Sequence, residues 1–199
     1  MYDFNAGDLS LNFANTKEWH GSQNPVENLK SYADLVTWGM QAGLVSPEAA
    51  DRLNQGAADH PHETSDMYEF AIQLREAIYR IFSYNYAGKP ISDADLSLLN
   101  SAACQAMSHL QLESKDKTFH WQLPSTLLDG NLILWPVARA AAELLTSDRA
   151  ARVRECEDNR GCGYLFIDQT KNHSRRWCSM ESCGNRAKAR RHYSRLQAN

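Results

Sequence analysis

Four of the chain's five cysteines lie within the last 44 of its 199 residues. They are Cys156, Cys162, Cys178 and Cys183, and they form the pattern C-x5-C-x15-C-x4-C. Four thiolates fill the tetrahedral shell that zinc prefers, and a filled shell leaves no position for water or substrate. The spacing therefore predicts one structural zinc ion held by these four cysteines, while Cys104 stands apart in an apolar stretch.

Two alternatives to this metal site are a pair of disulfide bonds and a site in which His173 or His192 replaces a cysteine. Residues 1–10 carry acids and no basic segment ahead of an apolar stretch, so we expect no secretory signal and a cytoplasmic protein. Disulfides are rare in that compartment, which favours metal. A segment of 49 residues with few large apolar side chains also needs a metal to hold its core.

The sequence around the cysteines predicts the elements that hold them. Residues 164–167 (YLFI) are a short apolar strand, and residues 168–174 are polar and typical of turns. Residues 184–196 are expected to form a helix that begins at the metal. A knuckle, a strand and a helix next to the last ligand predict a small treble-clef or ribbon-like zinc finger.

Basic residues are concentrated in the same segment. Residues 151–199 carry eleven Lys and Arg against five Asp and Glu, a net charge of +6, whereas residues 1–150 carry −9. Such an asymmetry indicates that the basic part meets a polyanion. The composition, with 43% hydrophobic and 23% charged residues, is that of a globular protein, and no apolar run approaches the ~20 residues that a membrane helix needs.

The predicted C-terminal helix presents two sets of basic residues. At 100° per residue, Lys188, Arg191 and Arg195 share a sector of about 60° roughly opposite Cys183. We expect that sector to face phosphates, and a merely solvated helix face is the alternative. The predicted nucleic-acid-binding residues are Lys171, Arg175, Arg176, Lys188, Arg191 and Arg195.

A second set of residues is expected to support the zinc site: Asp168, Trp177, Asn185 and Arg186. Zinc bound by four thiolates carries a net charge of about −2, which a nearby arginine offsets. We therefore expect Arg186 to pair with Asp168 or with a cysteine sulfur. Trp177 is interpreted as packing under the zinc, although an aromatic ring among basic residues can also stack on single-stranded bases.

Residues 1–150 are predicted to form a mainly α-helical domain with few short strands. Apolar residues recur at helical spacing in 29–44, 67–82, 92–110 and 134–145, and Ser46-Pro47 starts a further helix. Residues 117–123 alternate as a strand does. The composition changes after Ala151, so we divide the chain into domains 1–150 and 151–199 and expect each to fold on its own.

Several short motifs resemble known families. Residues 163–168 (GYLFID), 176–180 (RWCSM) and 183–188 (CGNRAK) resemble the CGNR zinc finger. Residues 11–16 (LNFANT) and 32–36 (YADLV) are similar to the ABATE domain, a helical domain that precedes this finger and is described as a stress-induced transcription regulator. The resemblance implies a bacterial, zinc-containing, DNA-binding regulator.

Three polar residues of the N-terminal motif, Asn12, Asn15 and Thr16, interrupt an otherwise apolar segment. Buried polar groups need hydrogen-bond partners, so these side chains either cap local backbone or line a cavity. We favour capping. A cavity would suit a domain that senses a small molecule.

Our functional hypothesis is a transcription regulator whose finger contacts double-stranded DNA and whose helical domain senses a small-molecule effector or forms a homodimer. The alternative is an RNA-associated or protein-interaction module that uses the basic finger as a docking surface. A zinc hydrolase is disfavoured because the sequence has no Gly-rich phosphate loop, G-x-S-x-G or H-E-x-x-H motif. A closed four-cysteine site also has no open position for catalytic water, so we expect no enzyme.

Overall fold

The computed structural model describes residues 2–124 and 129–197. The helices are α1 (Leu9–Ala14), α2 (Tyr32–Gln41), α3 (Pro47–Asp59), α4 (Pro61–Tyr86), α5 (Asp93–His109), α6 (Leu134–Leu145) and α7 (Asn185–Gln197). The antiparallel strand pairs are β1 (Lys17–Glu18) with β2 (Val26–Glu27), β3 (Gln111–Lys115) with β4 (Thr118–Gln122), and β5 (Val153–Glu155) with β6 (Leu165–Ile167). The short turns are η1 (Asp148–Arg152) and η2 (Met180–Gly184). The predicted mainly α fold with a small four-cysteine finger is confirmed.

Local sequence signals explain where the helices begin and end. Ser46 accepts a hydrogen bond from the amide of Ala49 at 3.2 Å, and Ser92 caps α5 in the same manner. Gly43, with φ of +74°, follows the end of α2 in a conformation that glycine adopts readily. Helix α4 starts at Pro61, about six residues before its apolar periodicity becomes visible in the sequence.

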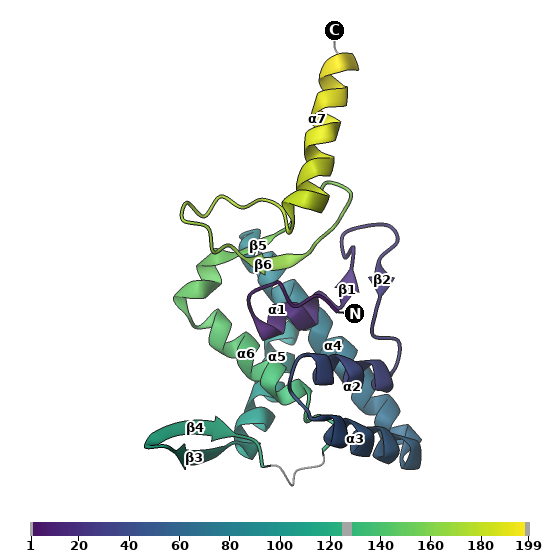
Figure 1. Ribbon diagram of the computed structural model, residues 1–199, viewed down its shortest axis with the longest axis vertical. Helices are drawn as coiled ribbons and strands as arrows, with labels where there is room; N and C mark the ends of the chain where they lie inside the picture. Colours follow the sequence, from purple (N-terminus) through teal and green to yellow (C-terminus); the bar gives the residue numbers. More distant parts are fainter. Residues whose placement is uncertain (1, 125–128, 198–199) are drawn as a thin grey trace.

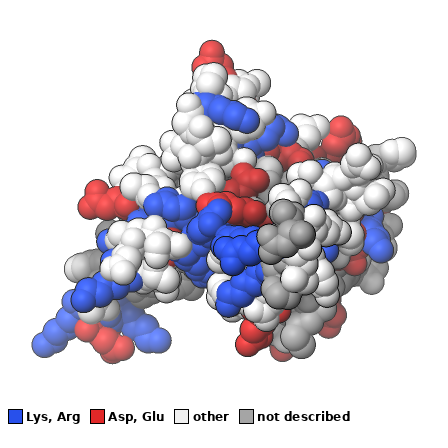
Figure 2. Space-filling model, turned by 90° about the horizontal axis from the view of Figure 1, so that it is seen from above, with Lys and Arg blue, Asp and Glu red and all other residues white. Residues whose placement is uncertain are grey.

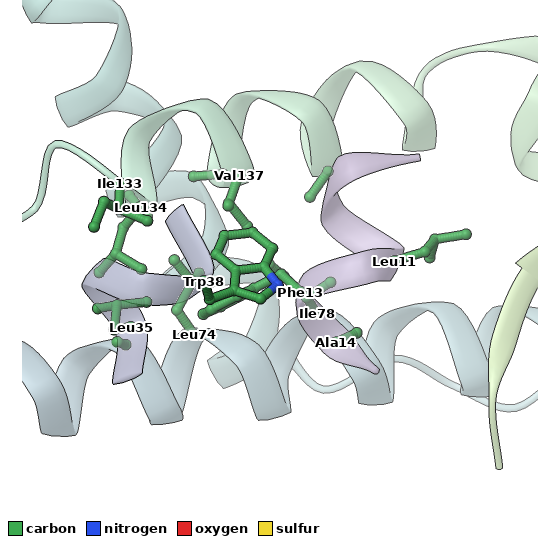
Figure 3. Close-up of a cluster of buried hydrophobic side chains, with 14 of the residues drawn as sticks. Leu11, Phe13, Ala14, Leu35, Trp38, Leu74, Ile78, Ile133, Leu134 and Val137 are labelled. Carbon is green, nitrogen blue, oxygen red and sulfur yellow. The ribbon is translucent and has the colours of Figure 1, made fainter. Parts of the chain in front are cut away.

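The main hydrophobic core lies where α1, α2, α4 and α6 meet (Figure 3). Trp38 is fully buried at its centre and packs its ring against Phe13, with 5.0 Å between ring centroids. Gly39 allows α2 to approach the segment before α6, because a Cβ at this position would lie 2.8 Å from Ile133. This body is the platform for the C-terminal finger.

Strand β6 is shared between two cores. Its side chains alternate, so Leu165 and Ile167 join Val153 in the main core, while Phe166 points to the other side and packs with Cys156 and Cys183. The division of the chain at residue 150 stays a prediction. The structure adds that one short strand serves the cores on both sides of that division.

Polar contacts fix the same hairpin to the helical body. The Asn15 side chain accepts from the Leu165 amide at 2.9 Å and donates to the Leu165 carbonyl at 2.8 Å, as a neighbouring strand would. On the other strand, Glu155 accepts from Tyr79 at 3.3 Å and from Ser83 at 2.5 Å, both on α4. Asn15 therefore satisfies backbone groups as expected, but those of the finger rather than of its own segment.

A buried ion pair holds the β1–β2 hairpin on α4. Both terminal nitrogens of Arg75 donate to the Glu27 carboxylate at 2.6 Å, and Arg75 is almost fully buried. The loop between the two strands reaches the finger, where the Gly21 amide donates to the Gly161 carbonyl at 3.1 Å. The helical body therefore contacts both the β5–β6 hairpin and the knuckle of the finger.

Two elements project from this body in different directions (Figure 1). Helix α7 stands out beyond the finger at one end, and the β3–β4 hairpin extends from the other end, beside α5 and α6. Among the described residues, no helix combines the length and the apolar character needed to cross a membrane.

Candidate metal centre and basic groove

The four predicted ligands come together in space. The sulfur atoms of Cys156, Cys162, Cys178 and Cys183 all lie within 4.8 Å of one another. Neighbouring sulfurs are 3.8 Å apart for Cys162 and Cys178, and 3.6 Å apart for Cys178 and Cys183. A tetrahedron with Zn–S bonds of about 2.3 Å has edges of about 3.8 Å, whereas a disulfide bond is about 2.05 Å long. The donor set therefore fits one zinc ion.

The electrostatics of the cluster also fit a cation. A hydrogen bond with Cys162 lowers the pKa of Cys156 to about 2, and the same interaction raises the pKa of Cys162 to about 12. The pKa of Cys178 is raised as well, because its thiol is hydrogen-bonded to Cys156. Thiols this close cannot all ionise by themselves, and a bound dication removes that restriction.

Backbone contacts set the spacing of the first ligand pair. Cys156 follows β5, and its amide donates to the Tyr164 carbonyl at 2.9 Å. Before Cys162, Gly161 has φ of +84°, and a Cβ there would clash with the backbone of Gly21. Only glycine allows the knuckle to turn and lie against the β1–β2 loop at once.

The second ligand pair leads directly into α7. Cys178 precedes η2, and Cys183 lies within this π-helical turn, which Ser179 caps by accepting from the Ser182 amide. Helix α7 continues from the turn without a break. The turn η2, which holds the ligand Cys183, therefore sets the direction in which α7 leaves the metal site.

Asp158, the central acid of the finger, was not predicted from the sequence. Its side chain is fully buried and accepts from Arg160 at 3.2 Å, from Arg186 at 3.3 Å and from Arg190 at 3.2 Å. Although burial alone would raise it, these hydrogen bonds, led by those from Arg160, hold the pKa of Asp158 well below its usual range. Arg186 also donates to the Cys183 sulfur at 2.9 Å. It therefore touches the zinc site, but pairs with Asp158 instead of Asp168.

Asp168 supports a loop and has no contact with the ligand sulfurs among the described residues. Its carboxylate is fully buried and accepts from the Thr170 amide at 2.9 Å, the Thr170 hydroxyl at 2.6 Å and the Arg175 amide at 2.8 Å. The Arg175 guanidinium donates to the carbonyls of Trp177 and Cys178 and lies over the Phe166 ring. Arg175, a predicted nucleic-acid contact, therefore points into the finger.

Trp177 and Asn185 lie at the edge of the zinc site. Trp177 is half-buried against the cysteine cluster, with the guanidinium carbons of Arg176 and Arg191 within 5.8 Å of its ring centre. Asn185 is exposed and donates to the Glu181 carbonyl at 3.3 Å. The supporting roles of both residues stay predictions.

A basic groove of about 540 Å³ runs between the knuckle and α7. Its charged lining consists of Glu157, Arg176, Arg190, Arg191 and Arg195. The groove thus brings together three of the six predicted nucleic-acid contacts, Arg176, Arg191 and Arg195. Arg176 is bound there by Glu157, which accepts from its Nε at 2.6 Å.

The other three predicted contacts do not line the groove. Lys171 and Lys188 are exposed, and Arg175 points into the finger. Viewed from the end that bears α7, Lys and Arg side chains gather toward the centre and one side of the molecule, with acidic groups between and around them (Figure 2). The finger end therefore presents a mixed but mainly basic surface.

A four-cysteine finger that continues into a basic helix and is seated on a helical body defines a zinc-finger protein. Residues 7–148 match the family model ABATE, described as "Putative stress-induced transcription regulator", and residues 152–196 match the CGNR zinc finger. Because the first match covers more than half of the chain, the protein belongs to the ABATE family. No curated protein matches the sequence.

The family assignment and the site agree with each other. An ABATE domain is followed by a CGNR zinc finger, as the motifs indicated, and the cysteine cluster of that finger is consistent with one zinc ion. The descriptions of both families name a regulator and a finger, and neither names an enzymatic activity.

Proposed function

We propose that the protein is a cytoplasmic, non-enzymatic transcription regulator that binds double-stranded DNA through α7. In this proposal the helical domain forms a homodimer and responds to a small-molecule effector. One observation carries the proposal. Helix α7 stands clear of the body with Lys188, Arg191 and Arg195 exposed, while Asp158 ties Arg186 and Arg190 to the finger.

The paired and the exposed basic residues of α7 differ in what they can bind. Arg186 and Arg190 donate hydrogen bonds to Asp158, and Arg186 also donates to Cys183. These bonds within the finger orient α7. The exposed set can neutralise phosphates, releasing the counterions that DNA carries and making binding depend on salt. We propose Lys171, Arg176, Lys188, Arg191 and Arg195 as contacts and omit Arg175, whose guanidinium faces carbonyl groups.

Replacing Arg191 by alanine should weaken binding of duplex DNA about equally for all sequences. Each lost phosphate contact reduces the slope of log affinity against log salt by roughly one unit. The melting temperature should change little, since an exposed charge contributes on the order of 1 kcal/mol or less. The measurement is affinity against salt for the zinc-loaded protein, paired with a melting curve.

Arg186→Ala is the matched control because it lies on the same helix and removes the same charge. It should lower the melting temperature or zinc retention before it changes the salt slope. An unchanged slope for Arg191→Ala, with binding intact, would move the contact surface to Lys171 and Arg176. Preference for RNA would support the RNA-associated alternative, and no binding of either polymer at low salt would support the protein-docking alternative.

The β3–β4 hairpin supports the homodimer. Its register pairs Leu112 with Trp121 and Ser114 with Phe119, so these side chains share one face of the hairpin. The three apolar side chains on this face are exposed: Leu112 by 58%, Trp121 by 49% and Phe119 by 72%. A two-stranded hairpin is marginal in water without a packed face, and an exposed apolar face marks an interaction site.

A second copy of the chain is the partner we propose for this face, because a single finger needs a two-fold related copy to read two half-sites. Replacing Phe119 by aspartate should convert a dimer into a monomer in sedimentation velocity at micromolar concentration. His120→Asp, on the polar face of the same strand, should leave the dimer intact. A wild-type protein that sediments as a monomer would contradict this part of the proposal.

A further inference from the structure

A cavity of about 600 Å³ lies between the helical body and the finger. The helical side contributes Tyr2, Asn12 and Trp19, and the finger side contributes Tyr164 and Arg186. One end of the cavity is formed by the zinc-ligand residues Cys162, Cys178 and Cys183, so a ligand would occupy the part away from the metal. The volume falls within the roughly 300–1,000 Å³ of small-molecule sites, which are often found between domains. A molecule bound here would touch both parts of the chain.

Two polar groups of the lining have unused hydrogen-bonding capacity. The Tyr164 hydroxyl is buried and makes no hydrogen bond of good geometry among the described residues. Burial and the nearby Asp3 carboxylate raise its pKa, which keeps the hydroxyl protonated and able to donate. Asn12 is buried and its side-chain oxygen accepts from the Ala6 amide at 3.0 Å. Its NH2 group lies on the same lining and can donate to a ligand. An unpaired buried hydroxyl is costly, so its persistence beside a cavity indicates a ligand that satisfies it.

The charges of the lining disfavour an anionic ligand, because Asp3 and Glu18 are also part of it. The basic side chains that line the cavity within the described ranges are both occupied: Lys17 by Glu76 at 3.4 Å and Arg186 by Asp158 at 3.3 Å. A phosphate or carboxylate would therefore find no free cation. Tyrosine and tryptophan rings next to hydroxyl and carboxamide groups suit a planar, uncharged molecule with hydrogen-bonding edges.

The lining also connects to the zinc site. Trp19 has φ of +58°, a left-handed conformation that costs energy for a bulky residue and recurs at functional sites. Its ring centre lies 5.5 Å from the guanidinium carbon of Arg186, and Arg186 donates to the Cys183 sulfur. An occupant of the cavity therefore contacts groups that hold the start of α7.

We infer that this cavity is an effector site for an uncharged nitrogen heterocycle of nucleobase or nucleoside size, held by Tyr164 and Asn12. The inference deepens the proposed function, since it rests on the sensing role given there to the helical domain. The experiment measures ligand binding without DNA. Its result therefore tests the effector site even if the protein does not bind DNA.

Calorimetric titration of the zinc-loaded full chain with adenine, hypoxanthine, uracil and adenosine should show binding of at least one compound. Adenosine monophosphate should bind more weakly than adenosine, because its phosphate meets no free cation. Tyr164→Phe should weaken binding of the compound that binds by about 10-fold, the loss expected for one hydrogen bond. The free variant should keep its zinc and melt no lower than the wild type, because the deleted hydroxyl makes no hydrogen bond of good geometry there.

Tyr79→Phe is the matched control. Its hydroxyl lies outside the cavity and donates to Glu155 at 3.3 Å, so its loss should lower the melting temperature and leave ligand affinity unchanged. The inference is overturned if no uncharged compound of the set binds, if the monophosphate binds more tightly than the nucleoside, or if Tyr164→Phe binds as the wild type does.

Discussion

Replacing Cys178 by serine should release zinc and lower the melting temperature of the helical body as well as unfold the finger. Without the metal, the β5–β6 hairpin loses its support, and Val153, Leu165 and Ile167 leave the main core. Each such buried side chain contributes about 1.5–3 kcal/mol. We therefore expect the helical signal in circular dichroism to melt at least about 10 °C lower, with zinc falling from about one ion per chain to nearly none.

Cys104→Ser is the control for this experiment. Cys104 is an exposed cysteine on α5, away from the cluster, so its replacement should leave both the zinc content and the melting temperature unchanged. If Cys178→Ser loses zinc while the helical signal melts at the wild-type temperature, the helical body is independent of the finger. The shared strand would then contribute little to its stability.

Replacing Asp158 by asparagine should be the next most damaging change. The neutral amide would leave Arg160, Arg186 and Arg190 facing one another around a buried site without a compensating charge. Breaking a buried ion pair typically costs 3–5 kcal/mol. Because the three arginines are partly exposed, we expect about 2–3 kcal/mol. The measurements are the free energy of unfolding in urea and the rate of zinc transfer to a chromophoric chelator, which should rise.

Glu157→Gln is the control, because it removes the charge of the neighbouring carboxylate in the chain. Glu157 pairs with Arg176 at the surface, so its loss should change the free energy of unfolding by less than about 1 kcal/mol. Equal effects of the two replacements would show that the central position of Asp158 has no special importance.

The helices were predictable because their signals are local. Ser46 with Pro47, Ser92 and the apolar periodicity of α4 depend only on neighbouring residues, and the structure confirms all three elements. The cysteine spacing was equally informative, since a closed four-thiolate shell has few alternatives. The strand β4 was visible from its alternation.

The parts that the sequence did not reveal depend on contacts between distant residues. Asn15 and Leu165 are 150 positions apart, and only the folded chain shows that the carboxamide completes the edge of β6. Asp158 is one of five acids in residues 151–199, and only the folded chain shows that it is the one that Arg160, Arg186 and Arg190 surround. Strands of two or three residues, such as β1, β2 and β5, are too short to carry a periodic pattern.

The expectation that the two parts fold independently stays a prediction, and it came from their different compositions and opposite charges. Charge describes the surface, however, and the shared core is made by apolar residues that alternate along β6. Leu165 and Ile167 face the helices, and Phe166 between them faces the zinc site. A three-residue strand can therefore join two regions whose compositions differ sharply.

DNA binding by α7 is tested most directly by recovering nucleic acid crosslinked to the protein in cells and sequencing it. We expect duplex DNA enriched at discrete sites, each with two related half-sites. The enrichment should be lost in a variant that carries Lys188→Ala, Arg191→Ala and Arg195→Ala and retains its zinc. Recovery of RNA, or of no nucleic acid above a mock sample, would contradict the proposal that α7 binds DNA.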